Sequence, residues 1–332
     1  MKRSLLNVCE TVGFFTVLEL LIDEFQKVFM DNSLNLTHIT LSGYVEISKY
    51  RYLYFFIMFA VYVLIICSNS AIVYIICSHR DLHKPMYVFI AALLLNCFTY
   101  STTVYPKLLI DFLSEEQTIS YSACLLQFFT FYSVGGSEFL LLAAMAYDRY
   151  VSICKPLRYA AIMTKKIVTA LLILAWTVPP LHISVLTILN AEAKICKYDL
   201  NGIFCNNTMY KIYCLSSRSV TVIGVVALVD LVILPMLFTV FTYAKIFIIS
   251  YQSCKEFRRK AAETCFPHLL VLVSFSCLVL YDVIIARVDS DIPKIARLIM
   301  TLQIILYHPL FNPFIYGLKM KEISKHLKRC LR

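Results

Sequence analysis

The charged residues that interrupt the apolar stretches of this 332-residue sequence are its main candidates for chemistry. Asp148 and Arg149 are neighbours at the end of one such stretch, where a carboxylate and a guanidinium could form an ion pair that opens and closes. Glu138, Asp230 and Asp282 lie inside apolar stretches. An ionisable side chain at the centre of a membrane costs about 2.5–3.5 kcal/mol on insertion scales, so such residues are usually functional. Ion pairing and ligand binding are therefore the chemistry that this pattern indicates.

The composition places these residues in a membrane protein. Hydrophobic residues make up 60% of the sequence and charged residues only 16%, whereas soluble domains carry about 25% charged residues. A membrane-spanning helix needs about 20 mostly apolar residues. The sequence therefore predicts an all-α membrane protein, a bundle of seven transmembrane helices whose two termini lie on opposite sides. The predicted spans are Leu53–Cys77, Val88–Leu109, Leu125–Tyr147, Ile167–Leu189, Val220–Ile249, Phe266–Ile285 and Ile295–Tyr316.

The distribution of lysine and arginine predicts the orientation, because positive residues gather on the cytoplasmic side. They cluster in alternate connections and in the C-terminal tail, so the C-terminus is expected in the cytoplasm and the N-terminus outside. The net charge of +10 is then an orientation signal and gives no reason to expect nucleic acid as a partner. The basic tail could also bind anionic membrane lipid. The residues on this side are Arg80, Lys84, Arg149, Lys155, Arg158, Lys165, Lys166, Lys245, Lys255, Arg258, Arg259, Lys260, Lys319, Lys321, Lys325, Lys328, Arg329 and Arg332.

This topology divides the chain into three regions. Residues 1–52 form an extracellular N-terminal segment, residues 53–318 the transmembrane domain and residues 319–332 a short basic cytoplasmic tail. Asn35 and Asn206 each precede a threonine by two positions, which matches the acceptor pattern for N-glycosylation. Both asparagines lie on the outer side in this topology, so both are expected to be glycosylation sites.

The cysteines divide by compartment. Of the 13 cysteines, four lie at or beyond the outer face, where disulfides persist. Four cysteines allow three pairings. Most of the others lie in or near helices and are expected to act as small apolar residues. No CxxC metal pattern occurs, and the sequence predicts neither a metal site nor a cofactor. The four outer cysteines are Cys124, Cys196, Cys205 and Cys214.

Two function classes lack sequence support. An intramembrane enzyme would need a catalytic set, and the sequence contains neither an HExxH motif nor a nucleophile elbow. A transporter often shows internal repeats with paired broken helices, and no such repeat is visible. The sequence therefore favours neither an enzyme nor a transporter.

One run closely resembles the cytoplasmic end of the third helix in odorant receptors, a branch of the rhodopsin-like (class A) G-protein-coupled receptors: residues Met145–Tyr159, M-A-Y-D-R-Y-V-S-I-C-K-P-L-R-Y. Three further segments follow the order of that family. Pro309–Tyr316 resembles its seventh-helix motif, Lys260–Leu269 the start of its sixth helix, and Pro85–Tyr87 the start of its second. The resemblance implies a multi-pass receptor of the plasma membrane that binds a small-molecule odorant from outside. It also implies a heterotrimeric G protein of the stimulatory olfactory type as partner, raising cyclic AMP.

The resemblance further implies a two-state switch at the cytoplasmic end of the bundle. Arg149 is expected to pair with Asp148 at rest and, once released, to meet tyrosines or a helix of the G protein. Pro313 removes a backbone hydrogen bond and lets the seventh helix bend, so that Tyr316 can swing. The expected switch residues are Asp148, Arg149, Tyr150, Tyr243, Asn312, Pro313 and Tyr316.

Family resemblance also selects among the disulfide pairings. Odorant receptors tie one cysteine of the loop between the fourth and fifth spans to the third helix, and hold a second bridge inside that loop. The resemblance therefore implies the pairs Cys124–Cys205 and Cys196–Cys214.

The buried acids depart from the usual pattern of rhodopsin-like receptors, which carry an acid in the second helix. Cys97 occupies that place here. Glu138 lies eleven positions before Arg149, where odorant receptors often hold a glutamate. Two roles for Glu138 stay open: binding a sodium ion, and a protonated, hydrogen-bonded structural role.

Two further features concern the branch and the start of the chain. Phe275-Ser276 stands where many tetrapod members show Phe-Tyr, and together with Leu95–Cys97 it resembles the fish-type branch of the family. Family members usually begin shortly before their glycosylation site, so Met30 resembles the usual start. We expect residues 1–29 to be an upstream extension of the reading frame.

The ligand site is expected between spans three, five, six and seven, toward the outside, because odorant receptors bind ligands there. Arg287 could hold a carboxylate through two parallel hydrogen bonds, so an acidic or zwitterionic ligand ranks above a neutral volatile. The alternative is a non-olfactory rhodopsin-like receptor for a small molecule or peptide. The expected pocket residues are Phe131, Tyr132, Gly135, Asp230, Tyr281, Asp282, Ile284 and Arg287.

Overall fold

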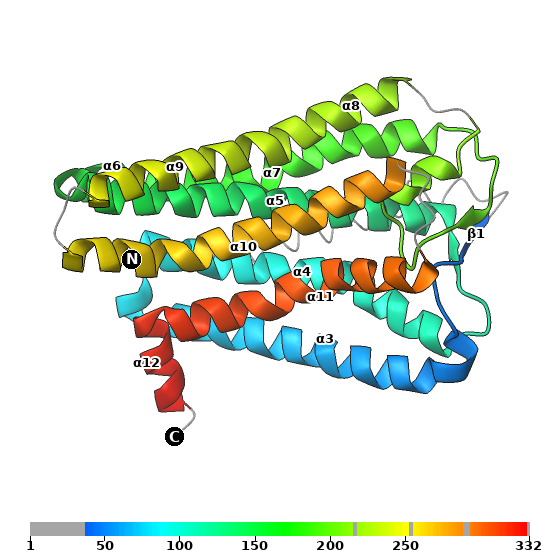
Figure 1. Cartoon of the computed structure of the whole chain (residues 1–332), viewed down its shortest axis with the longest axis horizontal. Helices are drawn as coiled ribbons and strands as arrows, with labels where there is room; N and C mark the ends of the chain where they lie inside the picture. Colours follow the sequence, from blue (N-terminus) through cyan, green and yellow to red (C-terminus); the bar gives the residue numbers. More distant parts are fainter. Residues whose placement is uncertain (1–36, 215–217, 252–254, 288–292, 331–332) are drawn as a thin grey trace.

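The structure, a computed structural model, describes residues 37–214, 218–251, 255–287 and 293–330. Within these residues, seven long helical segments run along the longest axis of the molecule (Figure 1). This confirms the predicted all-α bundle, although the first helix begins at Ile47 rather than at Leu53. The segments are α3 (Ile47–Ser78), α4 (Pro85–Leu113), α5 (Tyr121–Cys154), α7 (Lys165–Ala191), α8 (Arg218–Leu228) with α9 (Leu234–Tyr251), α10 (Lys255–Arg287) and α11 (Lys294–Lys319).

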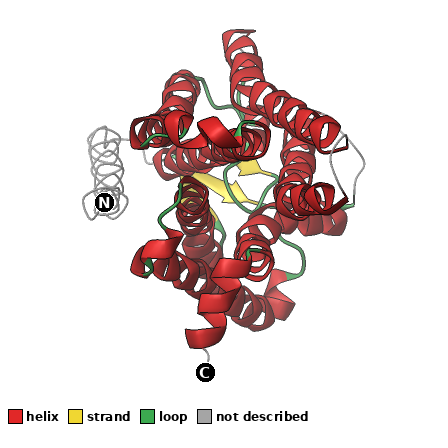
Figure 2. Ribbon diagram, turned by 90° about the vertical axis from the view of Figure 1, so that its left-hand side faces the viewer, coloured by secondary structure: helices red, strands yellow, loops and turns green. Residues whose placement is uncertain are grey.

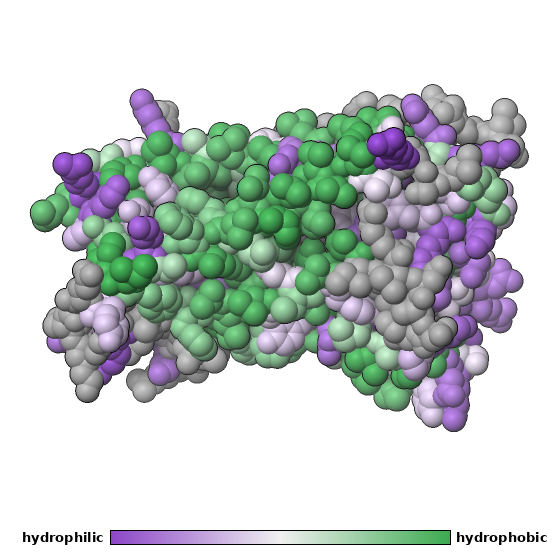
Figure 3. Space-filling model, turned by 45° about the horizontal axis from the view of Figure 1, so that its top comes forward, coloured by the Kyte–Doolittle hydropathy of each residue, from purple (hydrophilic) through white to green (hydrophobic). Residues whose placement is uncertain are grey.

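The outer surface of the bundle is suited to lipid. Of the described segments, six are long and apolar enough to cross a membrane, and the apolar part of α10, His268–Val283, is a shorter seventh. Hydrophobic side chains cover the middle of the face in Figure 3, and hydrophilic ones gather at its two ends. Phe56, Leu181 and Phe241 are 64%, 66% and 60% exposed. Lipid tails can cover such side chains where water would not. The chain is therefore a multi-pass membrane protein.

The fifth span is one continuous helix with a wider turn in its middle. A π-helical turn, η4 (Val229–Ile233), joins α8 to α9 and ends two residues before Pro235. Proline has no backbone N–H and its ring collides with a preceding carbonyl, so it disfavours a regular α-helical turn in the residues before it. A wider turn of this kind often marks a functional position in a helix.

Short helices complete the cytoplasmic and extracellular connections. The predicted basic tail is largely helical, and Ile323 and His326 of its helix are buried against the bundle. Hydrophobic and basic residues alternate with helical spacing in this segment, which suits the boundary between lipid and water. The short helices are η1 (Arg80–Leu82), η2 (Pro156–Arg158), α6 (Tyr159–Ile162), η3 (Asn207–Lys211) and α12 (Lys321–Cys330).

A small sheet that the sequence did not predict caps the outer end of the bundle (Figures 1 and 2). Its central strand, β1 (His38–Leu41), pairs antiparallel with β2 (Thr118–Ser120) and parallel with β3 (Asp199–Leu200). Ile39 and Leu41 point inward and are buried. The sheet thereby holds the loop between α7 and α8 over the outer end of α5.

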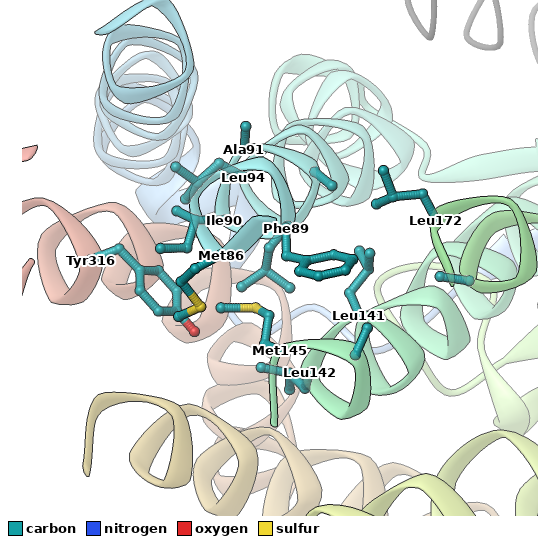
Figure 4. Packing of buried hydrophobic residues seen from close by; sticks show 14 of the residues in the cluster. Met86, Phe89, Ile90, Ala91, Leu94, Leu141, Leu142, Met145, Leu172 and Tyr316 are labelled. Carbon is teal, nitrogen blue, oxygen red and sulfur yellow. The ribbon is translucent and has the colours of Figure 1, made fainter. Parts of the chain in front are cut away.

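The cytoplasmic half of the bundle has a continuous apolar core. Phe89 and Met86 of α4 pack against Leu142 and Met145 of α5, and Tyr316 of α11 closes the cluster (Figure 4). All five side chains are 2% exposed or less. Lipid tails are as apolar as these side chains, so the cluster stabilises the bundle through close packing, and this packing positions the ends of α5 and α11 relative to each other.

Candidate functional site

The cytoplasmic end of α5 holds the predicted ion pair. The Nη2 atom of Arg149 donates to a carboxylate oxygen of Asp148 over 2.8 Å. The other oxygen of Asp148 accepts a hydrogen bond of 2.7 Å from the hydroxyl group of Tyr159. The chain turns back through η2 after α5, which brings Tyr159 of α6 beside Asp148. The carboxylate is fully buried, with 0% exposure, and has two donors in this state.

The hydroxyl group of Tyr159 remains a donor over a wide pH range. Burial, followed by the neighbouring Asp148 carboxylate, raises the pKa of Tyr159 above its ordinary value. A protonated hydroxyl is therefore available to Asp148 at physiological pH.

The tyrosines of the predicted switch lie in the same half of the bundle but do not bind Arg149 in this structure. Tyr316 is fully buried, and its hydroxyl lies 3.3 Å from Nδ1 of His268 on α10. Tyr243 is also buried, and its hydroxyl has no hydrogen-bond partner among the described residues. Arg149 bonds to Asp148 instead, so the structure is in the paired state of the predicted switch.

A polar cluster lies deeper in the bundle, where α4, α5 and α11 meet. The amide nitrogen of Asn312 lies 3.1 Å from Sγ of Cys97, 3.3 Å from Oε1 of Glu138 and 3.1 Å from Nε2 of His308. Nε2 of His308 lies 2.9 Å from Oε1 of Glu138. Asn96 donates to the other oxygen of Glu138 over 2.9 Å. Glu138 is 1% exposed, so this carboxylate is satisfied entirely by protein groups.

Both disulfide pairs expected from family resemblance are present in the structure: Cys124–Cys205 and Cys196–Cys214. The first ties the loop to the start of α5, and the backbone N–H of Cys205 donates to Gln127 over 2.9 Å. These contacts hold the residues after Cys205 above the outer end of the bundle.

A cavity of about 330 Å³ lies below this loop, lined by residues of α4, α5, α7, α8, η4, α10, α11 and η3. Its wall is mostly aromatic and aliphatic, and Phe131, Tyr132, Gly135 and Asp282 of the predicted pocket all line it. A mostly apolar wall with a few polar groups is typical of small-molecule sites.

Asp282 is the charged residue among the described lining of this cavity. The hydroxyl of Tyr132 donates to one carboxylate oxygen over 2.5 Å, and the side-chain amide of Asn207 donates to the same oxygen over 2.9 Å. The side-chain amide of Asn206 donates to the other oxygen over 2.8 Å. Asp282 is 3% exposed, and none of its described hydrogen-bond partners is a cation.

The model of the olfactory receptor family matches residues 58–332 of the chain. The chain belongs to the olfactory receptor family. It is 34% identical over 301 residues to human olfactory receptor 11A1, covering 89% of this chain and 94% of the relative. It is 33% identical over 314 residues to the chicken olfactory receptor-like protein COR5, covering 89% of this chain and 95% of the relative. The protein is therefore an odorant receptor of the G-protein-coupled class and not an enzyme; its place in the fish-type branch stays a prediction.

Two of the predicted pocket residues do not line the cavity of this olfactory receptor. Asp230 lies in the π-helical turn, and one of its carboxylate oxygens is 3.3 Å from Nε2 of His182 on α7. The Asp230 side chain is 41% exposed and is absent from the described lining of the cavity. Tyr281 packs instead against a cluster of buried residues that includes Leu298 and Ile304 of α11. The side chains of Ile284 and Arg287 lie outside the described part of the chain.

The two predicted glycosylation sites differ in where they lie in this olfactory receptor. Asn35 lies outside the described residues. Asn206 is 3% exposed, and its amide nitrogen is the one that bonds to Asp282. A glycan on that nitrogen would have to break this contact and open the loop, so the geometry opposes glycosylation of Asn206 in this fold.

Sequence reasoning missed three contributors to the sites of this receptor. The asparagines of the loop next to Asp282 belong to no sequence motif for ligand binding. No motif indicated a role for His308, yet it contacts Glu138. Tyr159 lies inside the run that resembles odorant receptors, but the run alone does not indicate that its hydroxyl meets Asp148. The only available signal for each was a polar side chain in or beside an apolar stretch.

Proposed function

We propose that this olfactory receptor detects a small, mostly apolar molecule that carries a basic amine, with the ammonium group held by Asp282. We propose also that the occupied receptor activates a stimulatory, olfactory-type G protein and raises cyclic AMP. The observation that carries the ligand assignment is the buried Asp282 carboxylate in the wall of the cavity, bonded only to neutral donors among its described contacts.

The charge of Asp282 favours a cation as its ligand. A buried carboxylate is costly unless it is hydrogen-bonded or paired with a charge. The hydroxyl of Tyr132 and two asparagine amides satisfy it in part, and a ligand ammonium group would add a charge-assisted hydrogen bond. An anionic ligand would instead face a like charge across a poorly hydrated cavity. This argument favours an amine over the acidic ligand that Arg287 suggested.

The remaining wall favours an apolar body for the ligand. Phe128, Phe131 and Phe275 line the cavity together with aliphatic residues of α8 and α10. Aromatic faces attract cations as well as apolar groups, so they suit the carbons next to an ammonium group. The volume of about 330 Å³ is near the lower end of ligand pockets, which are roughly 300–1,000 Å³.

The helix α10 offers a physical connection between the ligand and the cytoplasmic end. It carries Asp282 at the cavity and His268 beside Tyr316, about four helical turns away. A ligand ammonium group that binds Asp282 changes the position of α10. This movement alters the contact between His268 and Tyr316. The ligand thereby favours the state in which Arg149 leaves Asp148, as in a population shift between two packings.

The test is a cyclic AMP assay with ligands that differ in one functional group. A primary amine, the corresponding alcohol and the corresponding carboxylic acid on the same alkyl or aryl body are applied to cells with measured surface display. The amine is expected to activate at the lowest concentration. Asp282→Asn should raise the concentration of amine needed by roughly tenfold or more, the effect of losing about 1.4 kcal/mol. Asp230→Asn, the control for an acid outside the cavity, should leave it unchanged.

One further variant tests coupling to the G protein separately from the ligand class. Arg149→Ala should abolish the cyclic AMP response while surface display is retained, because it removes the residue proposed to meet the G protein. A response of the Arg149→Ala variant equal to the wild type would overturn the coupling mechanism. An equal response of the wild-type receptor to the acid and the amine would overturn only the role of Asp282.

A further inference from the structure

Three potential metal ligands converge in the middle of the bundle, below the odorant cavity. They are the thiol of Cys97 on α4, the carboxylate of Glu138 on α5 and the imidazole of His308 on α11. One ligand atom from each lies within 4.8 Å of the other two, and all three residues are buried. The distance from Sγ of Cys97 to Nδ1 of His308 is 4.0 Å, and Nε2 of His308 lies 2.9 Å from Oε1 of Glu138.

These distances are close to those that a tetrahedral ion requires. With the usual bond lengths to zinc, two ligand atoms at tetrahedral angles lie about 3.5 Å apart. The 4.0 Å distance starts from Nδ1 of His308 and the 2.9 Å distance from Nε2, so the imidazole ring has to turn for a single nitrogen to meet the ion. One ligand atom from each residue already lies within 4.8 Å of the others, so this turn and a small closure of the cluster bring the three ligands to the required separation. Three helices supply the three ligands, which is the reason that no local spacing in the sequence indicated a metal site.

We infer that Cys97, Glu138 and His308 form a binding site for a thiophilic divalent cation of the zinc class. Thiolate and imidazole ligands suit zinc, whereas sodium, magnesium and calcium prefer oxygen ligands throughout. The carboxylate of Glu138 favours a divalent ion over Cu(I), which prefers thiolate and thioether ligands. The inference concerns binding by the folded chain and does not depend on the identity of the odorant.

Asn312 offers a further ligand at the same point. Its amide nitrogen lies within 3.3 Å of the sulfur, the carboxylate oxygen and the imidazole nitrogen. A cation among these three atoms would lie beside this amide. The amide could then rotate and present its oxygen as a fourth ligand, since the two orientations occupy nearly the same space.

The surroundings provide a route to the site. Phe275 lines the odorant cavity, and its ring lies 4.4 Å from the imidazole ring of His308, measured between centroids. Rotation of this one ring would open the cluster to the cavity. An ion could therefore arrive from the extracellular side, and a ligand above Phe275 would influence its binding.

The ion would act on the switch, because it joins α4 and α5 to the part of α11 that carries Pro309 and Pro313. The cluster has its described geometry while Arg149 is paired with Asp148. An ion that fits this geometry favours the paired state, since a ligand shifts an equilibrium toward the state it binds better. Zinc should therefore reduce activation by an odorant.

The test measures metal binding by the purified full-length receptor after treatment with a chelator. Buffered Zn²⁺ is added, and bound zinc per receptor and the unfolding temperature are recorded for each variant with and without the ion. The wild type should bind zinc and unfold at a higher temperature in its presence. Cys97→Ser and Glu138→Gln should weaken zinc binding by roughly 100-fold, because each removes a direct ligand. Mg²⁺ and Na⁺ should produce no comparable shift.

Two controls keep the result decisive. Cys277→Ser removes an exposed free cysteine of α10 and should bind zinc like the wild type. Co²⁺ in place of zinc should give the absorption band of a cobalt–thiolate bond in the wild type, and this band should vanish in Cys97→Asp, which keeps a ligand but no sulfur. Equal zinc binding by the wild type and Cys97→Ser would overturn the inference. A stabilising shift with Na⁺ and none with Zn²⁺ would do the same.

Discussion

The hydroxyl group of Tyr132 lies 2.5 Å from a carboxylate oxygen of Asp282 and links α5 to α10 across the top of the cavity. The same hydroxyl accepts a hydrogen bond of 2.8 Å from the backbone N–H of Asn207. Tyr132 therefore connects the extracellular loop to the buried acid. The loop, the third span and the sixth span form one polar unit above an otherwise apolar cavity.

Removing this hydroxyl should destabilise the receptor without changing its fold. Tyr132→Phe leaves the buried Asp282 with one donor fewer, and a lost hydrogen bond to a charged group costs about 1.5–3 kcal/mol. We expect a lower unfolding temperature for the purified variant in the absence of ligand. Tyr54→Phe is the matched control, because Tyr54 lies on α3, away from this unit, and its ring stacks on Phe112. Equal stability of Tyr132→Phe and the wild type would contradict the proposed role of the hydroxyl.

The sequence predicted contacts that are local, or that family resemblance supplied, better than contacts between distant helices. Asp148 and Arg149 are neighbours in the chain, so their ion pair follows from the sequence once a helix end is placed there. The sites around Asp282 and Glu138 each need side chains from elements far apart in sequence. Helical periodicity places a residue on a face but does not determine which side chain of another helix it meets. The strands of the outer sheet were missed because two to four residues are too few for an alternating pattern.

Tyr159 should restrain spontaneous activation of the receptor. Its hydroxyl is one of two donors to Asp148, the partner of Arg149 in the paired state. Tyr159→Phe removes that donor and makes the paired state less favourable by about 1–3 kcal/mol. We expect cyclic AMP without odorant to rise several-fold at equal surface display. Tyr147→Phe, which changes the tyrosine that precedes Asp148 in α5 and has no described hydrogen bond to it, should leave the basal level unchanged. A basal level in Tyr159→Phe equal to that of the wild type would count against the restraint.

The docking of the tail helix α12 should depend on pH. Nε2 of His326 lies 2.9 Å from a carboxylate oxygen of Asp81, and this hydrogen bond is the main cause that lowers the pKa of Asp81 from its ordinary 3.8. A carboxyl whose pKa is lowered in the folded state stabilises that state above its ordinary pKa, and the effect is lost as the pH falls through the folded value. Docking should therefore weaken as the pH is lowered from about 5 to about 3.

The measurement for the tail is the mobility of a spin label attached through Lys325→Cys, after the accessible native cysteines are replaced. Lys325 is exposed on α12, so the label need not disturb the buried face. Mobility should increase with acid in this background. In Asp81→Asn it should be higher at neutral pH and change little between about pH 5 and pH 3, because the titrating group is absent. The same acid response in both proteins would assign it to another group.

Two adjacent glycines of α5 should respond differently to the same substitution. A Cβ atom at Gly136 would lie 2.9 Å from Cβ of Pro179 on α7 and 3.3 Å from Cδ1 of Leu231, so α5 and α7 would have to separate. Such overpacking costs about 1–3 kcal/mol, and Gly136→Ala should lower the unfolding temperature and the amount of receptor at the surface. At Gly135 the nearest atom, Cε2 of Tyr100, would lie 3.9 Å away, which is ordinary contact.

Gly135→Ala is therefore the matched control within the same helical turn. Alanine is favoured over glycine in a helix interior by about 0.5–1 kcal/mol, so this variant should be at least as stable as the wild type. Because Gly135 lines the cavity, the added methyl group should reduce the largest ligand that activates the receptor while leaving the fold intact. Both variants are compared by unfolding temperature and by the response to a series of amines of increasing length. Equal loss of stability in the two variants would mean that the close approach of Gly136 to Pro179 does not limit the packing of α5 against α7.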